Sequence, residues 1–214
     1  MITVFRPFSI MVICLLAVVL SSCSNKKARV SSEQQYWSTI SAIANDSKNY
    51  VQKHNLSDQY CLLVDYGLPS GTPRVYVWSF KENKIMFKAY TMHGSGGGST
   101  DEEPVFSNKL GSKCSALGNF AITRQHGTIN PAGYRLKGLD EENANAWDRA
   151  LMIHDSYWVD NYCDEKYIPL SEVICQGCVT VNVKAMEKIG RLVESESRMI
   201  LLRSFVVNKE VRTY

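Results

Sequence analysis

The chain has 214 residues, with 24 Lys and Arg against 21 Asp and Glu and a formal net charge of +3 at pH 7. It contains no basic cluster interleaved with aromatic residues, which argues against a nucleic-acid-binding protein. Residues 31–214 have the length of one domain with its own hydrophobic core.

The N-terminus predicts an exported protein. An apolar run over residues 10–20 follows Arg6 and is shorter than a bilayer span, so it is typical of a signal-peptide core. The run ends in the letters LSSC, at Cys23, and this stretch resembles a bacterial lipobox. The resemblance implies cleavage before Cys23 and lipid attachment to its sulfur. An ordinary signal peptide or an anchor helix is the alternative.

These features divide the chain into three parts. We expect a lipoprotein signal peptide over residues 1–22, a polar tether over 23–34 and one folded domain over 35–214. Ser24 is not the acidic residue that is linked with retention in an inner membrane. We therefore expect a lipid-anchored protein of the cell envelope, which faces the periplasm from the outer membrane if the organism is Gram-negative.

Hydrophobic periodicity predicts a mainly β domain with flanking helices, of the α+β class. Apolar residues recur at helical spacing over residues 33–54, and a second helix is expected over about 183–194. NANAWDR is expected to form a helical turn. The predicted strands are YCLLVDYG, a hairpin of RVYVWSF and KIMFKAYTMH, GNFAITR, YRLKGL, ALMIHDSYWV, VTVNV and the closing strand MILLRSFVV. The loop GSGGGSTDEEPVFSNKLGSKCSALG is too long for a simple connection, which indicates a functional or disordered segment.

The exported part has an odd number of cysteines, namely Cys61, Cys114, Cys163, Cys175 and Cys178. In an oxidising envelope an odd count leaves one thiol free, unless it pairs between chains. One hypothesis pairs Cys163 with Cys175 and Cys61 with Cys114, which leaves Cys178 as the free thiol.

The stretch VICQGCVTVN allows other interpretations of Cys175 and Cys178. A redox pair usually precedes a helix, whereas VTVNV has the pattern of a strand. A zinc site would need two more ligands, for which Cys163 and His154 are candidates, but their spacing is irregular. We therefore expect no metal and no cofactor, and the third interpretation is a cysteine nucleophile.

His154 is the candidate base for a Cys178 nucleophile. A thiolate is a strong nucleophile, and an imidazole within reach can take the thiol proton. Gly177 would permit a tight turn and could let backbone N–H groups point at an oxyanion. On spacing alone, a structural or surface role is the more common one for a single histidine.

Four blocks in chain order strengthen this interpretation: MHGSGGGS, FSNKLGSKCSALGNFAITR, RLKGLDEENANAWDRALMIHDS and CQGC. Together they resemble the murein L,D-transpeptidase catalytic-domain family, over about residues 75–181. The resemblance implies a mixed β-sandwich-like fold and a peptidoglycan stem peptide as substrate. Cys178 would attack the carbonyl before the terminal D-alanine, and His154 would act as general base and then general acid. Backbone donors around Gly177 would stabilise the oxyanion.

The resemblance also suggests substrate-binding residues. His93 matches the histidine of the family's glycine-rich loop and would lie at the pocket, with a structural role as the alternative. Arg135 could pair with a stem carboxylate, although it could equally be a solvated surface residue. Ser156, which takes a position usually held by alanine in the family, could orient the His154 imidazole. Cys175 and Val179 also depart from the family pattern, in which Ser or Thr and then Pro are usual.

Two functions of different classes follow from the sequence. The first is a peptidoglycan L,D-transpeptidase that forms an acyl-enzyme with a stem tetrapeptide and transfers it to an amine, or to water as an L,D-carboxypeptidase. The second is a non-catalytic envelope lipoprotein that binds stem peptides or a protein partner.

Overall fold

The computed structural model describes residues 32–128, 130–174 and 176–214. The predicted signal peptide, Cys23, most of the tether and Cys175 therefore lie outside the described residues. Among the residues that are described, no helix has both the length and the apolar character that a membrane crossing requires.

The chain divides into two compact units, Met1–Asn45 and Asp46–Tyr214. A helix begins at residue 32 in the first unit and ends at residue 53 in the second, as the periodicity predicts. In the first unit, hydroxyl groups bond to carbonyls one turn back: Thr39 donates to Gln35 and Ser41 donates to Trp37.

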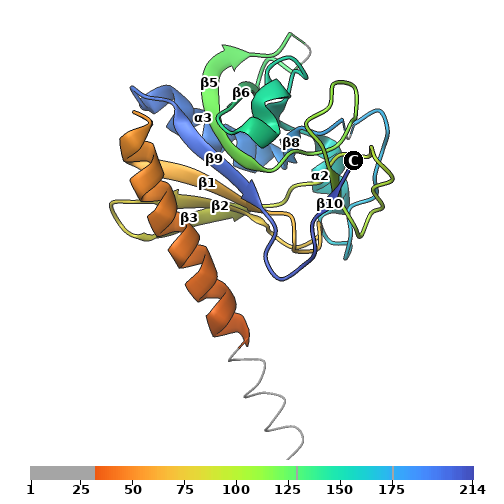
Figure 1. Ribbon diagram of the computed structural model, residues 1–214, viewed down its shortest axis with the longest axis horizontal. Helices are drawn as coiled ribbons and strands as arrows, with labels where there is room; N and C mark the ends of the chain where they lie inside the picture. Colours follow the sequence, from red (N-terminus) through yellow and green to blue (C-terminus); the bar gives the residue numbers. More distant parts are fainter. Residues whose placement is uncertain (1–31, 129, 175) are drawn as a thin grey trace, which may run out of the picture. The chain divides into compact units, whose positions relative to one another are not determined.

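A mixed sheet, eight-stranded over the described residues, forms the second unit (Figure 1). In spatial order its strands are β3 (Lys84–Ala89), β2 (Val75–Ser79), β1 (Tyr60–Asp65), β9 (Ile200–Phe205), β5 (Gly118–His126), β6 (Tyr134–Gly138), β7 (Met152–Asp155) and β8 (Val179–Val181). The pairs β1–β9 and β7–β8 are parallel, and the other neighbours are antiparallel. The sheet confirms the mainly β class.

The predicted closing strand takes an internal place in this sheet. β9 lies between β1 and β5, although it is almost the last element of the chain. A further short strand, β10 (Arg212–Thr213), follows it and pairs in parallel with β4 (Val105–Phe106) inside the long loop.

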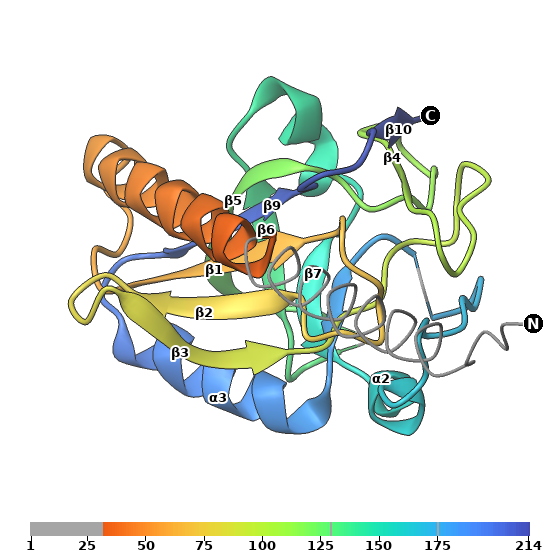
Figure 2. The same cartoon turned by 90° about the horizontal axis from the view of Figure 1, so that it is seen from below.

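The helical elements are η1 (Glu141–Ala146), α2 (Tyr157–Tyr162) and α3 (Val183–Ser195). η1 and α3 agree with the helical turn and the second helix that the sequence predicts. α3 runs along one face of the sheet (Figure 2). Its buried residues face the core and are Ala185, Met186, Ile189 and Val193.

One predicted strand is shorter than expected, because a helix replaces its second half. The segment ALMIHDSYWV was predicted as a single strand, but β7 ends at Asp155. The Ser156 hydroxyl accepts a hydrogen bond from the Trp158 backbone N–H at 3.1 Å. The Ser156 side chain thus acts as an N-cap and accepts from a backbone N–H that has no partner within the helix. This interaction favours a helix over a longer strand.

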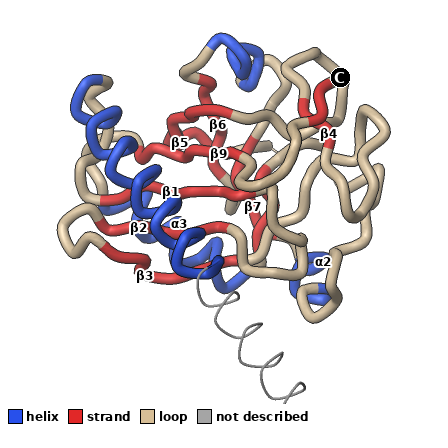
Figure 3. The backbone as a smooth tube through the Cα atoms, turned by 60° about the horizontal axis from the view of Figure 1, so that its bottom comes forward, coloured by secondary structure: helices blue, strands red, loops and turns tan. Residues whose placement is uncertain are grey.

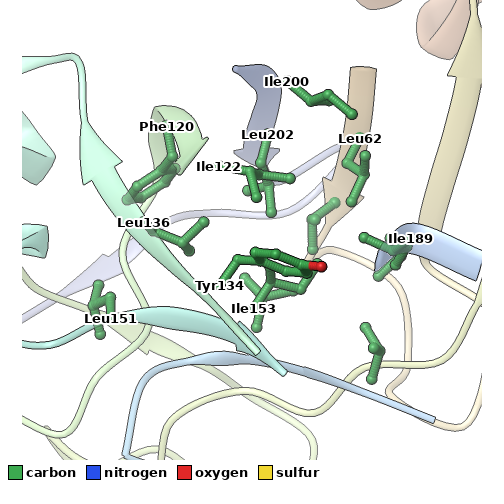
Figure 4. Close-up of a cluster of buried hydrophobic side chains, with 14 of the residues drawn as sticks. Leu62, Phe120, Ile122, Tyr134, Leu136, Leu151, Ile153, Ile189, Ile200 and Leu202 are labelled. Atoms are coloured by element: carbon green, nitrogen blue, oxygen red, sulfur yellow. The ribbon is translucent and has the colours of Figure 1, made fainter. Parts of the chain in front are cut away.

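The core fills the space between the sheet and α3. Figure 4 shows side chains from four strands converging there with Ile189 of α3: Leu62 of β1, Phe120 and Ile122 of β5, Leu136 of β6 and Leu202 of β9. Because side chains alternate between the two faces of a strand, residues next to these core positions point to the opposite face. Loops gather at one end of this sheet (Figure 3).

Candidate active site

Strand alternation places Cys178 and His154 on the same face of the sheet. Ile153 pairs with Val179 across the parallel β7–β8 ladder, and both belong to the buried core. His154 pairs with Thr180, and Cys178 lies two residues before Thr180. The apolar residues therefore turn inward, and the imidazole and the thiol both turn to the opposite face.

A cavity of about 480 Å³ opens on that face. Four of the predicted site residues line it, namely Cys178, His154, Ser156 and Arg135. Its remaining walls come from the loop after β5, from β7 and the segment before it, and from the segment before Cys178. These lining residues are Gly127, Thr128, Asn130, Arg149, Ala150, Met152, Asp155, Val173, Ile174 and Gln176. Residues far apart in the sequence thus converge on one concave site.

The hydrogen bonds of His154 define its tautomer. Nδ1 lies 2.8 Å from the backbone carbonyl oxygen of Asp155, which can only accept, so Nδ1 carries the proton. Nε2 of the neutral ring is then an acceptor and receives a hydrogen bond from the Thr180 hydroxyl at 3.3 Å. The ring is therefore prepared to act as a base at Nε2, on the side of β8.

Burial keeps the imidazole neutral. His154 is only 7% exposed, and desolvation lowers its pKa below the ordinary 6.5, against opposing contributions from the Asp155 backbone and carboxylate. A neutral imidazole can accept a proton, whereas an imidazolium cannot.

Burial has the opposite effect on Cys178. Desolvation raises the pKa of its thiol above 9.0, and a hydrogen bond from the Met152 backbone and the charges of Arg149 and Arg135 offset part of that rise. The directions of these pKa shifts favour a neutral thiol and a neutral imidazole in the resting cavity. The thiolate would form by proton transfer when substrate binds.

Gly177 is required by the backbone at this point. Its φ is +102°, outside the range that residues with a side chain readily adopt. A Cβ here would also lie 2.3 Å from the backbone oxygen of Cys114, which is closer than such atoms approach. The tight turn expected before Cys178 is therefore confirmed.

Arg135 presents an unused donor. Its Nη2 donates to the Trp147 carbonyl at 2.5 Å, and its guanidinium stacks over the Trp147 ring with 4.2 Å to the centroid. Its Nε is buried without a hydrogen-bond partner, although the residue lines the cavity. A buried unpaired N–H is costly, which makes this group a suitable partner for a ligand oxygen.

Ser156 and His93 behave differently from the expectations for them. Ser156 lines the cavity, but its hydroxyl caps α2, and Asp155 and Thr180 hold the imidazole instead. His93 is 1% exposed and is absent from the cavity lining. The structure thus corrects its placement at the pocket.

The contacts of His93 explain this placement. Its Nδ1 lies 3.2 Å from Nη2 of the buried Arg74, and its Nε2 lies 2.8 Å from the Thr100 carbonyl oxygen. Burial and the Arg74 charge lower the pKa of His93 to about 3. The buried His93 side chain thus links the glycine-rich loop, through the Thr100 carbonyl, to Arg74.

Sequence reasoning gave no role to Thr180 and Arg149. Thr180 could have been found from strand alternation, since it lies two residues after Cys178. Arg149 stands in the third of the four blocks, between the alanines and His154. It lines the cavity, and its guanidinium donates to the carbonyls of Ser107 and Cys114 in the long loop.

The cysteines are free where they can be described. Cys61, Cys114, Cys163 and Cys178 form no disulfide among the described residues. The hypothetical pair of Cys61 and Cys114 is therefore corrected. Cys61 belongs to a strand inside the sheet, whereas the Cys114 thiol donates locally to the Ser112 carbonyl. The partner proposed for Cys163 lies outside the described residues.

The described ranges contain no group of three His, Cys, Asp or Glu side chains that could hold a metal ion. The zinc alternative also needed Cys175, which is not among those residues.

The family profile described as "L,D-transpeptidase catalytic domain" matches residues 31–202. The chain belongs to this L,D-transpeptidase family. The resemblance seen in the four sequence blocks is therefore confirmed. The family acts on the stem peptides of peptidoglycan.

Comparison with solved structures finds similarity to two chains. They are crystal structures of the helical cell shape determining protein Pgp2 from Campylobacter jejuni and of its K307A mutant. Both are 15% identical, with TM-scores of 0.41 and 0.42, and the alignments cover 73% of this chain. The chain spans about half of each Pgp2 chain, 51% and 50% respectively. No curated protein matches.

Proposed function

We propose that this chain is a peptidoglycan L,D-transpeptidase whose nucleophile is Cys178 and whose general base is His154. The observation that carries the proposal is the β7–β8 register, by which core residues turn Cys178 and His154 toward the same cavity. Family membership supplies the substrate class, a peptidoglycan stem peptide.

In the first step the Cys178 thiol transfers its proton to Nε2 of His154. The sulfur attacks the carbonyl carbon of the peptide bond between the third stem residue and the terminal D-alanine. The C–N bond then breaks, and the imidazolium returns the proton to the departing amine. D-Alanine leaves, and the third stem residue remains as a thioester on Cys178.

In the second step an acceptor amine from a neighbouring stem attacks the thioester. His154 takes a proton from that amine, the C–S bond breaks, and the thiolate regains a proton. The product is a crosslink between two stems. If water takes the place of the amine, the same site releases a shortened stem, as an L,D-carboxypeptidase does.

Two groups support the charged parts of this reaction. The positive-φ turn at Gly177 comes directly before Cys178, and the backbone N–H groups of this turn would stabilise a developing oxyanion. The unused Nε of Arg135 is suited to a carboxylate of the stem peptide, because a guanidinium binds such oxygens with charge-assisted hydrogen bonds.

The test for the nucleophile is covalent capture by a carbapenem, whose carbonyl carbon a thiolate attacks. Intact-mass measurement should show one adduct on the wild type and none on Cys178→Ala. Cys163→Ala is the matched control, because Cys163 is a partly exposed cysteine that does not line the cavity. An adduct that persists in Cys178→Ala would remove Cys178 from the mechanism.

Incubation with defined muropeptides separates the possible activities. Crosslinked dimers identify a transpeptidase, and shortened stems with free D-alanine identify a carboxypeptidase. The absence of both products, together with no carbapenem adduct, would favour the non-catalytic lipoprotein that binds stem peptides or a protein partner.

We also propose that Cys23 carries a lipid that anchors the protein in the cell envelope. The LSSC stretch after an apolar run supports this, as does a substrate class found in the envelope. Cys23→Ala should move the protein from the membrane to the soluble fraction and remove the acyl mass from the mature N-terminal peptide. An unchanged distribution would contradict the anchor.

A further inference from the structure

Arg149 connects the cavity wall to the long loop before β5. Its two terminal nitrogens donate to the carbonyls of Ser107 and Cys114, which both belong to the long loop before β5. The residue itself lines the cavity with Cys178. The guanidinium therefore joins the long loop to the wall that carries the nucleophile.

Two hydrogen bonds of a helix-ending turn hold the backbone around Arg149. The Leu151 N–H bonds to the Ala146 carbonyl at 2.9 Å, and the Ala150 N–H bonds to the Trp147 carbonyl at 3.0 Å. This is the pattern that commonly ends a helix, with a residue of positive φ in the next-to-last place. Here that residue is Ala150, with φ +55°, where glycine is usual. The turn holds Arg149 in place between η1 and β7.

The hydrogen bond between Arg149 and Cys114 lies directly against Gly177. A Cβ placed on Gly177 would be 2.3 Å from the Cys114 oxygen and 3.2 Å from Nη2 of Arg149. The residue before the nucleophile therefore packs onto this hydrogen bond. Loss of the guanidinium would leave the Cys114 carbonyl free to move, together with the turn that rests on it.

We propose that Arg149 is a positioning residue for Cys178, which fixes the turn at Gly177 through the Cys114 carbonyl and holds a positive charge beside the thiolate. Its catalytic meaning rests on the proposed function. The charge and the positioning have separate consequences. Burial raises the pKa of the Cys178 thiol, and the positive charge of Arg149 opposes that rise.

Two variants separate these consequences. Arg149→Lys keeps the charge but not the planar fork that reaches two carbonyls, and Arg149→Gln removes the charge as well. Arg191→Gln is the matched control, since Arg191 is exposed on α3. Each protein is studied well below its own unfolding temperature, so that only folded protein is compared.

The first measurement is the pH profile of Cys178 alkylation by iodoacetamide, followed on the Cys178 peptide by mass spectrometry. It requires no enzyme activity. Arg149→Gln should shift the profile upward by about one pH unit, the usual scale for removing a neighbouring opposite charge. Arg149→Lys and Arg191→Gln should keep the wild-type profile. A role limited to stability would leave every profile unchanged.

The second measurement is the rate of carbapenem acylation. Arg149→Lys should acylate about 10- to 100-fold more slowly than the wild type, because a small misplacement of a reacting group has an effect of this size. Arg191→Gln should match the wild type. If Arg149→Gln does not fold, Arg149→Lys decides the question, and wild-type acylation in that variant overturns the positioning role.

The two measurements also separate this inference from the proposed function. Wild-type protein that takes up no carbapenem would count against the transpeptidase activity, while the alkylation profiles would still test the charge of Arg149. Wild-type alkylation in a folded Arg149→Gln variant overturns the charge role.

Discussion

The hydroxyl of Thr180 lies 3.3 Å from Nε2 of His154, and the two residues are direct partners across the parallel β7–β8 ladder. The other ring nitrogen donates to the Asp155 carbonyl. In the resting site both nitrogens therefore have partners on the protein. The Thr180 hydroxyl occupies the lone pair that would take the thiol proton, so the proposed mechanism requires this long hydrogen bond to be exchanged for one from Cys178.

Thr180→Val should raise the pKa of the His154 imidazole. The Thr180 hydroxyl donates to the neutral ring, and its loss removes an interaction that favours the neutral form. Thr180→Ser keeps a hydroxyl and should retain the wild-type pKa. NMR titration of His154 measures the shift, and equal pKa values in all three proteins would contradict the assigned tautomer.

Replacing His154 by Ala should slow carbapenem acylation by about two to four orders of magnitude, the usual contribution of general acid–base catalysis. Exposed His54→Ala is the control. In the wild type, the rate should fall on acidification only below the ordinary imidazole range, because burial lowers the pKa of His154. It should continue to rise into the alkaline range, because burial raises the pKa of Cys178. An acid limb centred above pH 6.5 would contradict this order.

The protein should lose stability in acid through His93. The pKa of this imidazole is about 3 in the folded chain and an ordinary 6.5 in the unfolded chain, so between these values only the unfolded chain binds the proton. Above pH 6.5, His93 is neutral in both states and does not reduce the free energy of unfolding. Below pH 6.5, protonation of His93 in the unfolded chain lowers the free energy of unfolding by about 1.4 kcal/mol per pH unit until the pH approaches 3.

His93→Gln should have a smaller slope of unfolding free energy against pH than the wild type. It should be less stable at neutral pH, because the contacts with Arg74 and Thr100 change. Urea unfolding at several pH values measures both effects, with His54→Gln as a control that removes an exposed imidazole. A slope unchanged by His93→Gln would show that another group is responsible.

Gly177→Ala should be more harmful than Gly111→Ala. Both glycines have positive φ, +102° and +71°, but a Cβ meets nothing within 4 Å at Gly111 and the Cys114 oxygen at Gly177. Gly111→Ala should cost about 1 kcal/mol from backbone strain alone. Gly177→Ala should cost more and should also slow acylation. Equal losses of stability with equal acylation would show that the contact with Cys114 does not matter.

Arg135→Gln should weaken the use of stem peptides that carry a free carboxylate. A hydrogen bond to a charged group contributes about 1.5–3 kcal/mol, so the specificity constant kcat/KM should fall by about tenfold or more. A stem with an amidated terminal carboxyl should be affected less. Competition between the two stems measures the ratio, and a ratio unchanged from wild type would exclude recognition of that terminal carboxylate.

The sequence by itself determined most of the elements and the candidate reacting residues. Alternating and helical apolar patterns predicted the long helix, the β2–β3 hairpin and the transition from β8 to α3, because these patterns depend on local geometry. Cys178, His154 and Gly177 followed from chemistry and four ordered blocks. The strand end at Asp155 was missed, because the Ser156 cap competes with an apolar pattern that suits either structure.

Only the tertiary structure decided how these residues meet. The parallel register of β7 and β8 made Thr180 the partner of His154, and the insertion of β9 between β1 and β5 was not visible in any local pattern. The fold buried His93 against Arg74 and brought Arg149 to the Cys114 carbonyl. Such contacts join positions distant in sequence, and their geometry depends on the packing of the whole sheet, which no short stretch of residues specifies.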